Sequence, residues 1–228
     1  MKVLVTGGTG YIGAHTVVEL MNSGFDVEII DNLNNSKEEV VDAIAKITGK
    51  RPIWFNIDLC DASELKNYFS KYKPDAVVHF AAHKAVGLSV EQPLEFYRNN
   101  LLSLINILQC CVDAKCNNFV FSSSCSVYAD PDKLPIDENA PVKTAKSPYG
   151  NTKKIGEEII TDTVKSSLLQ AVSLRYFNPV GSHDSALIGE LPTTMPLNVM
   201  PIITQVAIGK RKQFVVFGND YPTADGSC

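Results

Sequence analysis

The sequence predicts a doubly wound α/β fold, in which helices cover both faces of a parallel sheet. Three observations lead to this fold class. Short apolar segments alternate with longer segments that carry apolar residues at helical spacing. A glycine-rich stretch joins the first apolar segment to the first helical one. Polar residues follow several apolar segments directly, as they do where parallel strands end beside a ligand.

The expected strands are apolar runs bounded by polar or turn-forming residues, at 2–6, 25–30, 53–57, 76–80 and 119–122. The helices expected between them lie at 11–23, 36–47, 62–72 and 93–112. Gly24 and Gly49 are expected to end the first two helices, Ser36 and Glu39 form a capping-box pattern, and Pro93 begins the fourth helix. Strands separated by helices of this length pair in parallel.

The pattern changes after Phe177, where several prolines interrupt the chain. Beyond this residue only 199–208 and 214–217 look regular. We therefore expect a large α/β domain over residues 1–177 and the start of a smaller region over residues 178–228.

Composition excludes several classes of partner. The 228 residues carry 21 Lys+Arg against 25 Asp+Glu, a net charge of −4, which gives no electrostatic reason to expect nucleic acid or an anionic membrane. No apolar run approaches the ~20 residues that span a bilayer, and no secretory signal opens the chain. The six cysteines lack the spacing of a zinc site. We expect no metal and a reducing, cytoplasmic location.

The glycine-rich stretch predicts a phosphate-binding turn. Gly7, Gly10 and Gly13 lie between the first strand and the first helix, where a backbone without side chains can approach a diphosphate. Asp31 ends the second strand, and a carboxylate there accepts hydrogen bonds from the ribose hydroxyls and repels a 2′-phosphate. We therefore expect a Rossmann domain that prefers NAD to NADP, although Lys37 lies nearby.

Asp58 follows the third strand and has two readings. It is placed to contact the adenine of the dinucleotide, or it caps the next helix, a role for which Asp61 competes.

A tyrosine, a lysine and a serine suggest acid–base chemistry. Tyr149 and Lys153 are four residues apart, on one face of a helix if Pro148 begins it. A neighbouring ammonium and a bound nicotinamide would lower the pKa of the tyrosine and make it a competent base. Ser124 lies at the carboxyl end of the fifth strand, where ligands bind in such folds.

Seven blocks of sequence support a resemblance over the whole chain: GGTGYIG, DNLNNS, HFAAHKAVG, SSSCSVY, SPYGNTK, LRYFNPVG and FGNDYPTADG. The chain resembles the UDP-glucose 4-epimerase family, part of the extended short-chain dehydrogenases/reductases. The resemblance implies an isomerase of galactose metabolism that interconverts UDP-galactose and UDP-glucose by transient NAD-dependent oxidation at sugar C4. It also implies a homodimer built from the 93–112 helix and the Tyr149 helix.

The resemblance assigns roles residue by residue. Tyr149 is the base, Lys153 tunes it and holds the nicotinamide ribose, and Ser124 hydrogen-bonds the reacting oxygen. The positions that match the NAD contacts of the family, beside the three glycines, are Tyr11, Ile12, Asp31, Asn32, Asn35, Ser36, Asp58, Leu59, Phe80, Ala81, Ala82, Lys84, Asn99 and Phe177. The positions that match UDP-sugar contacts are Asn178, Asn198 and Phe217.

The chain departs from the family pattern in several places. Cys125 and Ser126 stand where Ala-Thr is common, Ala129 stands where glycine is usual, and 184–197 fits loosely. Family members continue beyond Cys228 into an Arg-Asp-Tyr segment and a lid, so we expect this chain to bind NAD but to epimerise UDP-galactose feebly or not at all.

Two alternatives follow. One is a non-catalytic NAD-binding module left by truncation. The other is a nucleotide-sugar 4,6-dehydratase, although that enzyme carries Thr-Asp-Glu at the position of Ser124-Cys125-Ser126.

Overall fold

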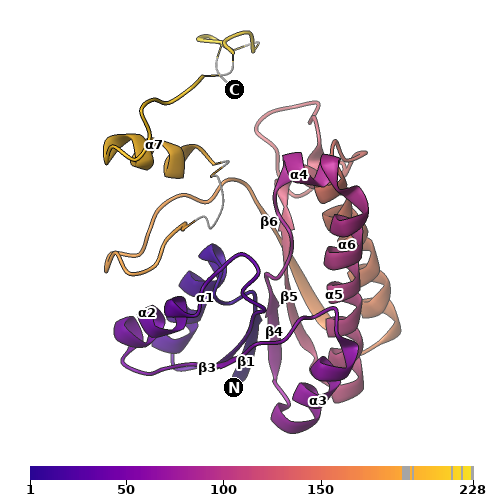
Figure 1. Cartoon of the computed structure of the whole chain (residues 1–228). Coiled ribbons are helices and arrows are strands. Elements are labelled where there is room, and N and C mark those ends of the chain that lie inside the picture. Colours follow the sequence, from indigo (N-terminus) through magenta and orange to yellow (C-terminus); the bar gives the residue numbers. More distant parts are fainter. Residues whose placement is uncertain (192–195, 197, 217, 222, 227–228) are drawn as a thin grey trace. The chain divides into compact units, whose positions relative to one another are not determined.

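The computed structural model describes residues 1–191, 196, 198–216, 218–221 and 223–226 (Figure 1). Contacts within the chain divide it into two compact units, Met1–Glu190 and Leu191–Cys228. The first unit holds the sheet and most of the helices, whereas the second holds α7 (Val199–Ala207). The domain boundary expected after Phe177 stays a prediction.

The fold class expected from the sequence is confirmed. The first unit contains a six-stranded sheet in the order β3-β2-β1-β4-β5-β6, and every pair of neighbouring strands is parallel. The strands are β1 (Lys2–Thr6), β2 (Asp26–Ile30), β3 (Ile53–Phe55), β4 (Ala76–His79), β5 (Asn118–Ser124) and β6 (Gln170–Tyr176).

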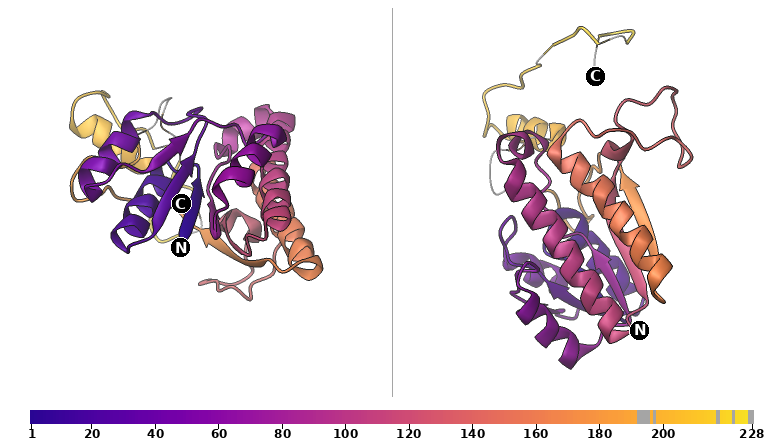
Figure 2. Two further views of the ribbon diagram at one scale, coloured as in Figure 1. Left: turned by 90° about the horizontal axis from the view of Figure 1, so that it is seen from below. Right: turned by 90° about the vertical axis from the view of Figure 1, so that its right-hand side faces the viewer.

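Helices cover both faces of this sheet, as Figure 2 shows. They are α1 (Tyr11–Asn22), α2 (Glu39–Thr48), α3 (Ala62–Tyr72), α4 (Val86–Glu91), α5 (Pro93–Ala114) and α6 (Pro148–Ser166). Alternation along β1 divides the core in two: Val3 and Val5 pack with α1 and α2, whereas Leu4 packs with α3, α5 and α6. A strand that is buried on both faces reads as a continuous apolar run, which explains the sequence of β1.

The expected helix ends are confirmed at three places. Gly24 and Gly49 take the left-handed conformation after α1 and α2, with φ of 83° and 74°. The side chain of Asp61 accepts hydrogen bonds from the backbone N–H groups of Ser63 and Glu64, so Asp61 and not Asp58 caps α3.

The prediction that Ser36 and Glu39 form a capping box at the start of a helix is wrong. Helix α2 begins at Glu39, and no side chain caps its first turn. The Ser36 hydroxyl instead lies 2.6 Å from Thr9 Oγ1 and donates to Asp31 Oδ1 at 3.2 Å. A tertiary contact with the glycine turn has therefore replaced the local capping bond.

Three elements lie outside the sequence expectations: β6, α4 and the short 3-10 helix η1 (Cys125–Tyr128). Strand β6 is an edge strand, and side chains such as Val172 and Leu174 are exposed, so the segment lacks the pattern of a buried strand. The regular segment expected at 214–217 is not seen at 214–216, and Phe217 lies outside the described residues.

His79, at the end of β4, makes the fold sensitive to acid. The side chain is 2% exposed, and Nδ1 lies 2.8 Å from Thr6 Oγ1. Burial, with a smaller effect of the Lys153 charge, lowers the pKa of His79 to about 3. An unfolded chain takes up this proton near pH 6.5, so the stability that is present above pH 6.5 is lost as pH falls towards 3.

We therefore expect His79 to lower the free energy of unfolding by on the order of 1 kcal/mol for each pH unit between about 6 and 4. Urea denaturation across this range measures the effect. His79→Asn is expected to be less stable at neutral pH but to lose less stability with acid. The same pH dependence in both proteins would contradict the prediction.

Candidate active site

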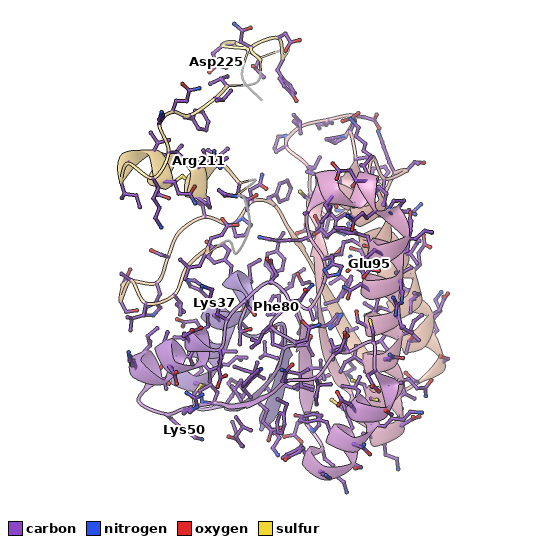
Figure 3. The ribbon with its side chains drawn as sticks, viewed as in Figure 1. Lys37, Lys50, Phe80, Glu95, Arg211 and Asp225 are labelled. Atoms are coloured by element: carbon purple, nitrogen blue, oxygen red, sulfur yellow. The ribbon has the colours of Figure 1, made fainter. Side chains whose placement is uncertain are left out.

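The loops that follow β1 and β4 meet where the strand order changes direction. Strand β1 lies between β2 and β4, so the connections after β1 and β4 run to opposite sides and leave a crevice at their carboxyl ends. Gly7 takes φ of 69°, and a Cβ on it would lie 2.7 Å from the Ala81 nitrogen. Only glycine permits this approach of the two backbones. Phe80, labelled in Figure 3, precedes Ala81 at the end of β4.

The turn after β1 suits an anion. Helix α1 begins after Gly10 with no side chain capping it and no acidic residue in its first turn. A Cβ on Gly13 would lie 2.1 Å from the Gly7 carbonyl oxygen, so the helix packs against the turn without a side chain between them. The N–H groups and the partial positive charge of a helix N-terminus favour a phosphate group, and the residues present therefore fit the diphosphate of a dinucleotide.

Asp31 lies beside this turn, at the end of β2. Its Oδ2 accepts a hydrogen bond from the Thr9 backbone N–H at 3.1 Å, and its Oδ1 accepts from the Leu33 backbone N–H at 2.9 Å. These bonds hold the carboxylate at the edge of the crevice. Lys37, also labelled in Figure 3, is exposed and lies two residues before α2 begins.

Other predicted NAD residues make local contacts of their own. Oxygens of Asn32 and Asp58 accept the backbone N–H two residues later, at 3.1 and 2.8 Å. Leu59 is buried, and Asn99 Nδ2 donates to Asn100 Oδ1 at 3.0 Å. All follow a strand end or lie on α5, and their assignment to NAD stays a prediction.

Tyr149, Lys153 and Ser124 meet at the end of β5. Helix α6 begins at Pro148, as expected, and the Ser147 side chain caps it by accepting the Gly150 N–H. The Tyr149 hydroxyl lies close to the Ser124 side chain, which favours its ionised form. Lys153 is 5% exposed, its Nζ donates to the Ser122 carbonyl at 2.7 Å, and this nitrogen lies 5.8 Å from the centre of the Tyr149 ring.

Burial dominates the electrostatics of this trio in the chain by itself. Burial raises the pKa of Tyr149, and the interaction with the Ser124 side chain opposes this only in part. Burial also lowers the pKa of Lys153 to about 8, so the ammonium loses its proton as pH rises through that value. In the chain by itself desolvation dominates the pKa of the tyrosine, and the expected lowering by Lys153 together with a bound nicotinamide stays a prediction.

The segment after β6 returns to the glycine turn. Tyr11 donates its hydroxyl to the Gly181 carbonyl at 2.7 Å. Lys84, a predicted NAD residue, forms an ion pair with Glu190 at 3.2 Å. Sequence reasoning missed Glu190, and nothing in its local pattern signals a partner so distant along the chain.

The predicted substrate residues fall in both units of the chain. Phe177 and Asn178 follow β6 and are exposed, in the first unit. Asn198 precedes α7 in the second unit, and Phe217 lies outside the described residues. Among the described residues, no group of acidic, histidine or cysteine side chains could hold a metal ion, and no helix is long and apolar enough to cross a membrane.

A cavity of about 340 Å³ lies beside the end of β5. Its lining includes Cys125, Tyr128, Ala129 and Phe177. Ala129 takes φ of 51°, a left-handed conformation that favours glycine. This explains why glycine is usual at the position in the family that the chain resembles.

Asn100 is a buried residue of the site that sequence reasoning missed. Its Oδ1 accepts the His83 N–H at 2.8 Å, and its Nδ2 donates to the His83 carbonyl at 3.0 Å and to Thr152 Oγ1 at 3.1 Å. These bonds connect the loop after β4 to α6. The only sequence signal is a polar residue at helical spacing from the apolar residues Phe96, Leu104 and Ile107.

Comparisons with known proteins agree with this geometry. The family model described as the NAD dependent epimerase/dehydratase family matches residues 3–225. The chain is 46% identical over 228 residues to a UDP-glucose 4-epimerase of Yersinia enterocolitica, covering 100% of this chain and 68% of the relative. It is 48% identical over 230 residues to a UDP-glucose 4-epimerase of Schizosaccharomyces pombe, and the match covers 99% of this chain and 64% of the relative. The chain thus spans about two thirds of the length of these relatives.

Solved structures show the same likeness. A UDP-glucose-4-epimerase of Stenotrophomonas maltophila, with bound NAD and formylated UDP-arabinopyranose, has a TM-score of 0.95 and 46% identity, covering 100% of this chain and 68% of that one. A UDP-glucose 4-epimerase of Bifidobacterium longum, in complex with NAD+ and UDP, has a TM-score of 0.96 and 42% identity with the same coverage.

Proposed function

The chain belongs to the NAD-dependent epimerase/dehydratase family, and from this premise we propose that it interconverts UDP-galactose and UDP-glucose with bound NAD. The observation that carries the proposal is the meeting of Tyr149, Lys153 and Ser124 at the end of β5, on the same edge of the sheet as the glycine turn. All six strands are parallel, so their carboxyl ends share that edge.

The residues of the chain divide the work. Tyr149 takes the proton of the sugar 4-hydroxyl and returns it after the sugar has turned over. Ser124 hydrogen-bonds the reacting oxygen, and the Lys153 ammonium stabilises negative charge on the tyrosine and on that oxygen. NAD held in the crevice would supply the hydride acceptor and donor that the exchange at C4 requires. The positive charge of a bound nicotinamide would add to that of Lys153. The two charges together would favour the phenolate form of Tyr149, which burial alone disfavours.

The residues proposed to hold NAD surround the crevice. The glycine turn and the N-terminus of α1 receive the diphosphate, and Asp31 receives the adenosine ribose. Lys84 forms its ion pair with Glu190 beside this site. Asn178, Asn198 and Phe217 stay predictions for the UDP-sugar.

The proposal is tested by incubating purified protein, loaded with NAD, with UDP-galactose and measuring UDP-glucose. Turnover supports the proposal. NAD binding without turnover would favour the non-catalytic module. Formation of a 4-keto-6-deoxy sugar would favour the dehydratase, which the absence of an acidic residue at 124–126 argues against.

Cofactor choice follows from the position of Asp31. We expect NAD to bind more tightly than NADP, because the carboxylate accepts ribose hydroxyls and repels a 2′-phosphate. Asp31→Ala should narrow the difference, mainly by weakening NAD binding about 10-fold or more, as expected when a hydrogen bond to a charged group is lost. Calorimetric titration with both cofactors measures this. Equal affinities for the unaltered protein would contradict the prediction.

The proposal includes a homodimer that uses α5 and α6. These helices lie side by side (Figure 2). Leu104 and Leu108 of α5 are buried in the core, whereas Leu94 and Ile105 are 81% and 47% exposed. Apolar side chains that stay exposed on a core helix favour burial against a partner helix. A cytoplasmic location also stays part of the proposal.

Light scattering on concentrated protein tests the dimer, and Ile105→Lys is expected to shift it to monomer. Ile53→Lys is the matched control, because Ile53 is 53% exposed on the edge strand β3. Monomer at every concentration of the unaltered protein would contradict the prediction, as would an equal effect of both substitutions.

A further inference from the structure

Helix α6 presents a third polar side chain to β5, beyond the two with proposed catalytic roles. Glu157 lies one helical turn after Lys153, at the i+4 spacing that places side chains on the same face. Its carboxylate accepts a short hydrogen bond from the Ser123 hydroxyl. Ser123 lies directly between Ser122, which receives Lys153, and Ser124, which receives Tyr149. Three successive residues of β5 therefore each receive one side chain from three successive turns of α6.

Arg175 fixes the Glu157 carboxylate from the next strand. It lies opposite Ser123 in the register between β5 and β6. Its Nε donates to Glu157 Oε1 at 3.0 Å and its Nη2 to Oε2 at 2.8 Å, a two-pronged geometry that specifies the orientation of both planar groups. The side chains of Arg175 and Glu157 are only 22% and 14% exposed. Such a pair is screened much less than a surface salt bridge.

The network also reaches the 3-10 helix after Ser124. Arg175 Nη1 donates to the Tyr128 hydroxyl at 2.8 Å, and the guanidinium carbon lies 4.8 Å from the centre of the Tyr128 ring. Glu157 and Arg175 thus join α6, β5, β6 and η1. Every element that places Tyr149, Lys153 and Ser124 is included.

The close packing of α6 on β5 makes the network sensitive to small shifts. A Cβ on Gly156 would lie 2.9 Å from the Phe121 ring, so the helix backbone packs directly on this side chain of β5 at this turn. The Lys153 ammonium lies 5.0 Å from the centre of the same ring. A rotation of α6 would consequently move Lys153 and Tyr149 together relative to Ser124.

Building on the proposed function, we propose that Glu157 is a positioning residue: with Arg175 and Ser123, it sets the rotation of α6 that aligns Tyr149 and Lys153 with the reacting oxygen on Ser124. It does not contact the sugar. It acts through the helix that carries the base.

Glu157→Gln tests the positioning role, because it keeps the shape of the side chain and removes the negative charge that Arg175 binds. We expect kcat to fall by about 100-fold, as for a small misplacement of reacting groups, while KM for UDP-galactose and the NAD content stay unchanged. The pH profile of kcat should shift, because the environment of Tyr149 changes. Glu158→Gln is the matched control: Glu158 is 63% exposed and its nearest cation, Lys154, is 3.9 Å away.

A merely structural role predicts a different result. Glu157→Gln would then lower the thermal midpoint, yet kcat per folded, NAD-loaded molecule and its pH profile would equal those of the unaltered protein. That outcome overturns the proposal. If Glu157→Gln does not fold, Ser123→Ala carries the test, since it removes only the bond from β5, and a kcat and pH profile equal to those of the unaltered protein would overturn the proposal equally.

The proposed function and the positioning role fail separately. If the unaltered protein does not turn over UDP-galactose, the proposed function fails, and positioning is read from the NAD-loaded protein by ultraviolet titration of its tyrosines. The signal of Tyr149 is the one lost in Tyr149→Phe. We expect Glu157→Gln to shift the midpoint of that signal and Glu158→Gln to leave it in place. An unshifted midpoint overturns the positioning role.

Discussion

Tyr149→Phe is expected to lower kcat by roughly 10²–10⁴-fold, the range typical for loss of a positioned general base. The substitution removes the hydroxyl that lies close to Ser124 and keeps the ring. Lys153 also donates to the Ser122 carbonyl, a bond that does not involve the tyrosine. The fold and the affinity for NAD should therefore change little. Initial rates of UDP-galactose conversion, normalised to bound NAD, measure the effect.

The control for this prediction is Tyr72→Phe. Tyr72 packs against Phe55 and Tyr68 at the end of α3, so loss of its hydroxyl should leave the rate unchanged. Near-full turnover by Tyr149→Phe would show that another group takes the proton.

Gly13→Ala is expected to abolish NAD binding or to prevent folding. The added Cβ would lie 2.1 Å from the Gly7 carbonyl oxygen and 2.9 Å from the Gly8 Cα. These contacts are with backbone, which has no rotamer to change, so α1 must move away from the turn. Overpacking of this kind costs about 1–3 kcal/mol or more, and the displaced helix N-terminus no longer faces the diphosphate. Thermal unfolding and NAD titration measure the two effects.

Gly87→Ala is the matched control, because Gly87 is also helical and nothing lies within 4 Å of its added Cβ. It should be neutral or slightly stabilising, since alanine favours helix more than glycine does. If Gly13→Ala bound NAD as well as Gly87→Ala, the glycine turn would not be the diphosphate site.

The buried half of the fold follows from the sequence because burial leaves a pattern. Strand β4 is a run of apolar residues, and the helix at 62–72 was bounded correctly because its apolar spacing and its Asp61 cap agree. Strand β6 leaves no such pattern, since the edge of a sheet tolerates exposed side chains. At Ser36, the local capping signal is genuine, but a bond to Thr9 from another part of the chain replaces it.

The candidate site divides in the same way. Tyr149 and Lys153 were predicted to share a helix face from their spacing, and Glu157 continues that spacing by one more turn. Arg175, the ion-pair partner that orients Glu157, lies on β6, the strand that the sequence pattern does not predict. The burial that raises the pKa of Tyr149 in the chain by itself could not be predicted either, because the degree of burial depends on packing that no local pattern specifies.

The strand order also has a consequence for synthesis of the chain at the ribosome. Strand β1 pairs with β2 and β4, so the crevice between the loops at Gly7 and Ala81 can close once β4 has emerged. Arg175 lies on β6, the last strand to join the sheet, well after Tyr149 in the chain. The nascent protein can therefore form its dinucleotide site first. Helix α6, which carries Tyr149, becomes fixed only later, when Arg175 of β6 can bind Glu157.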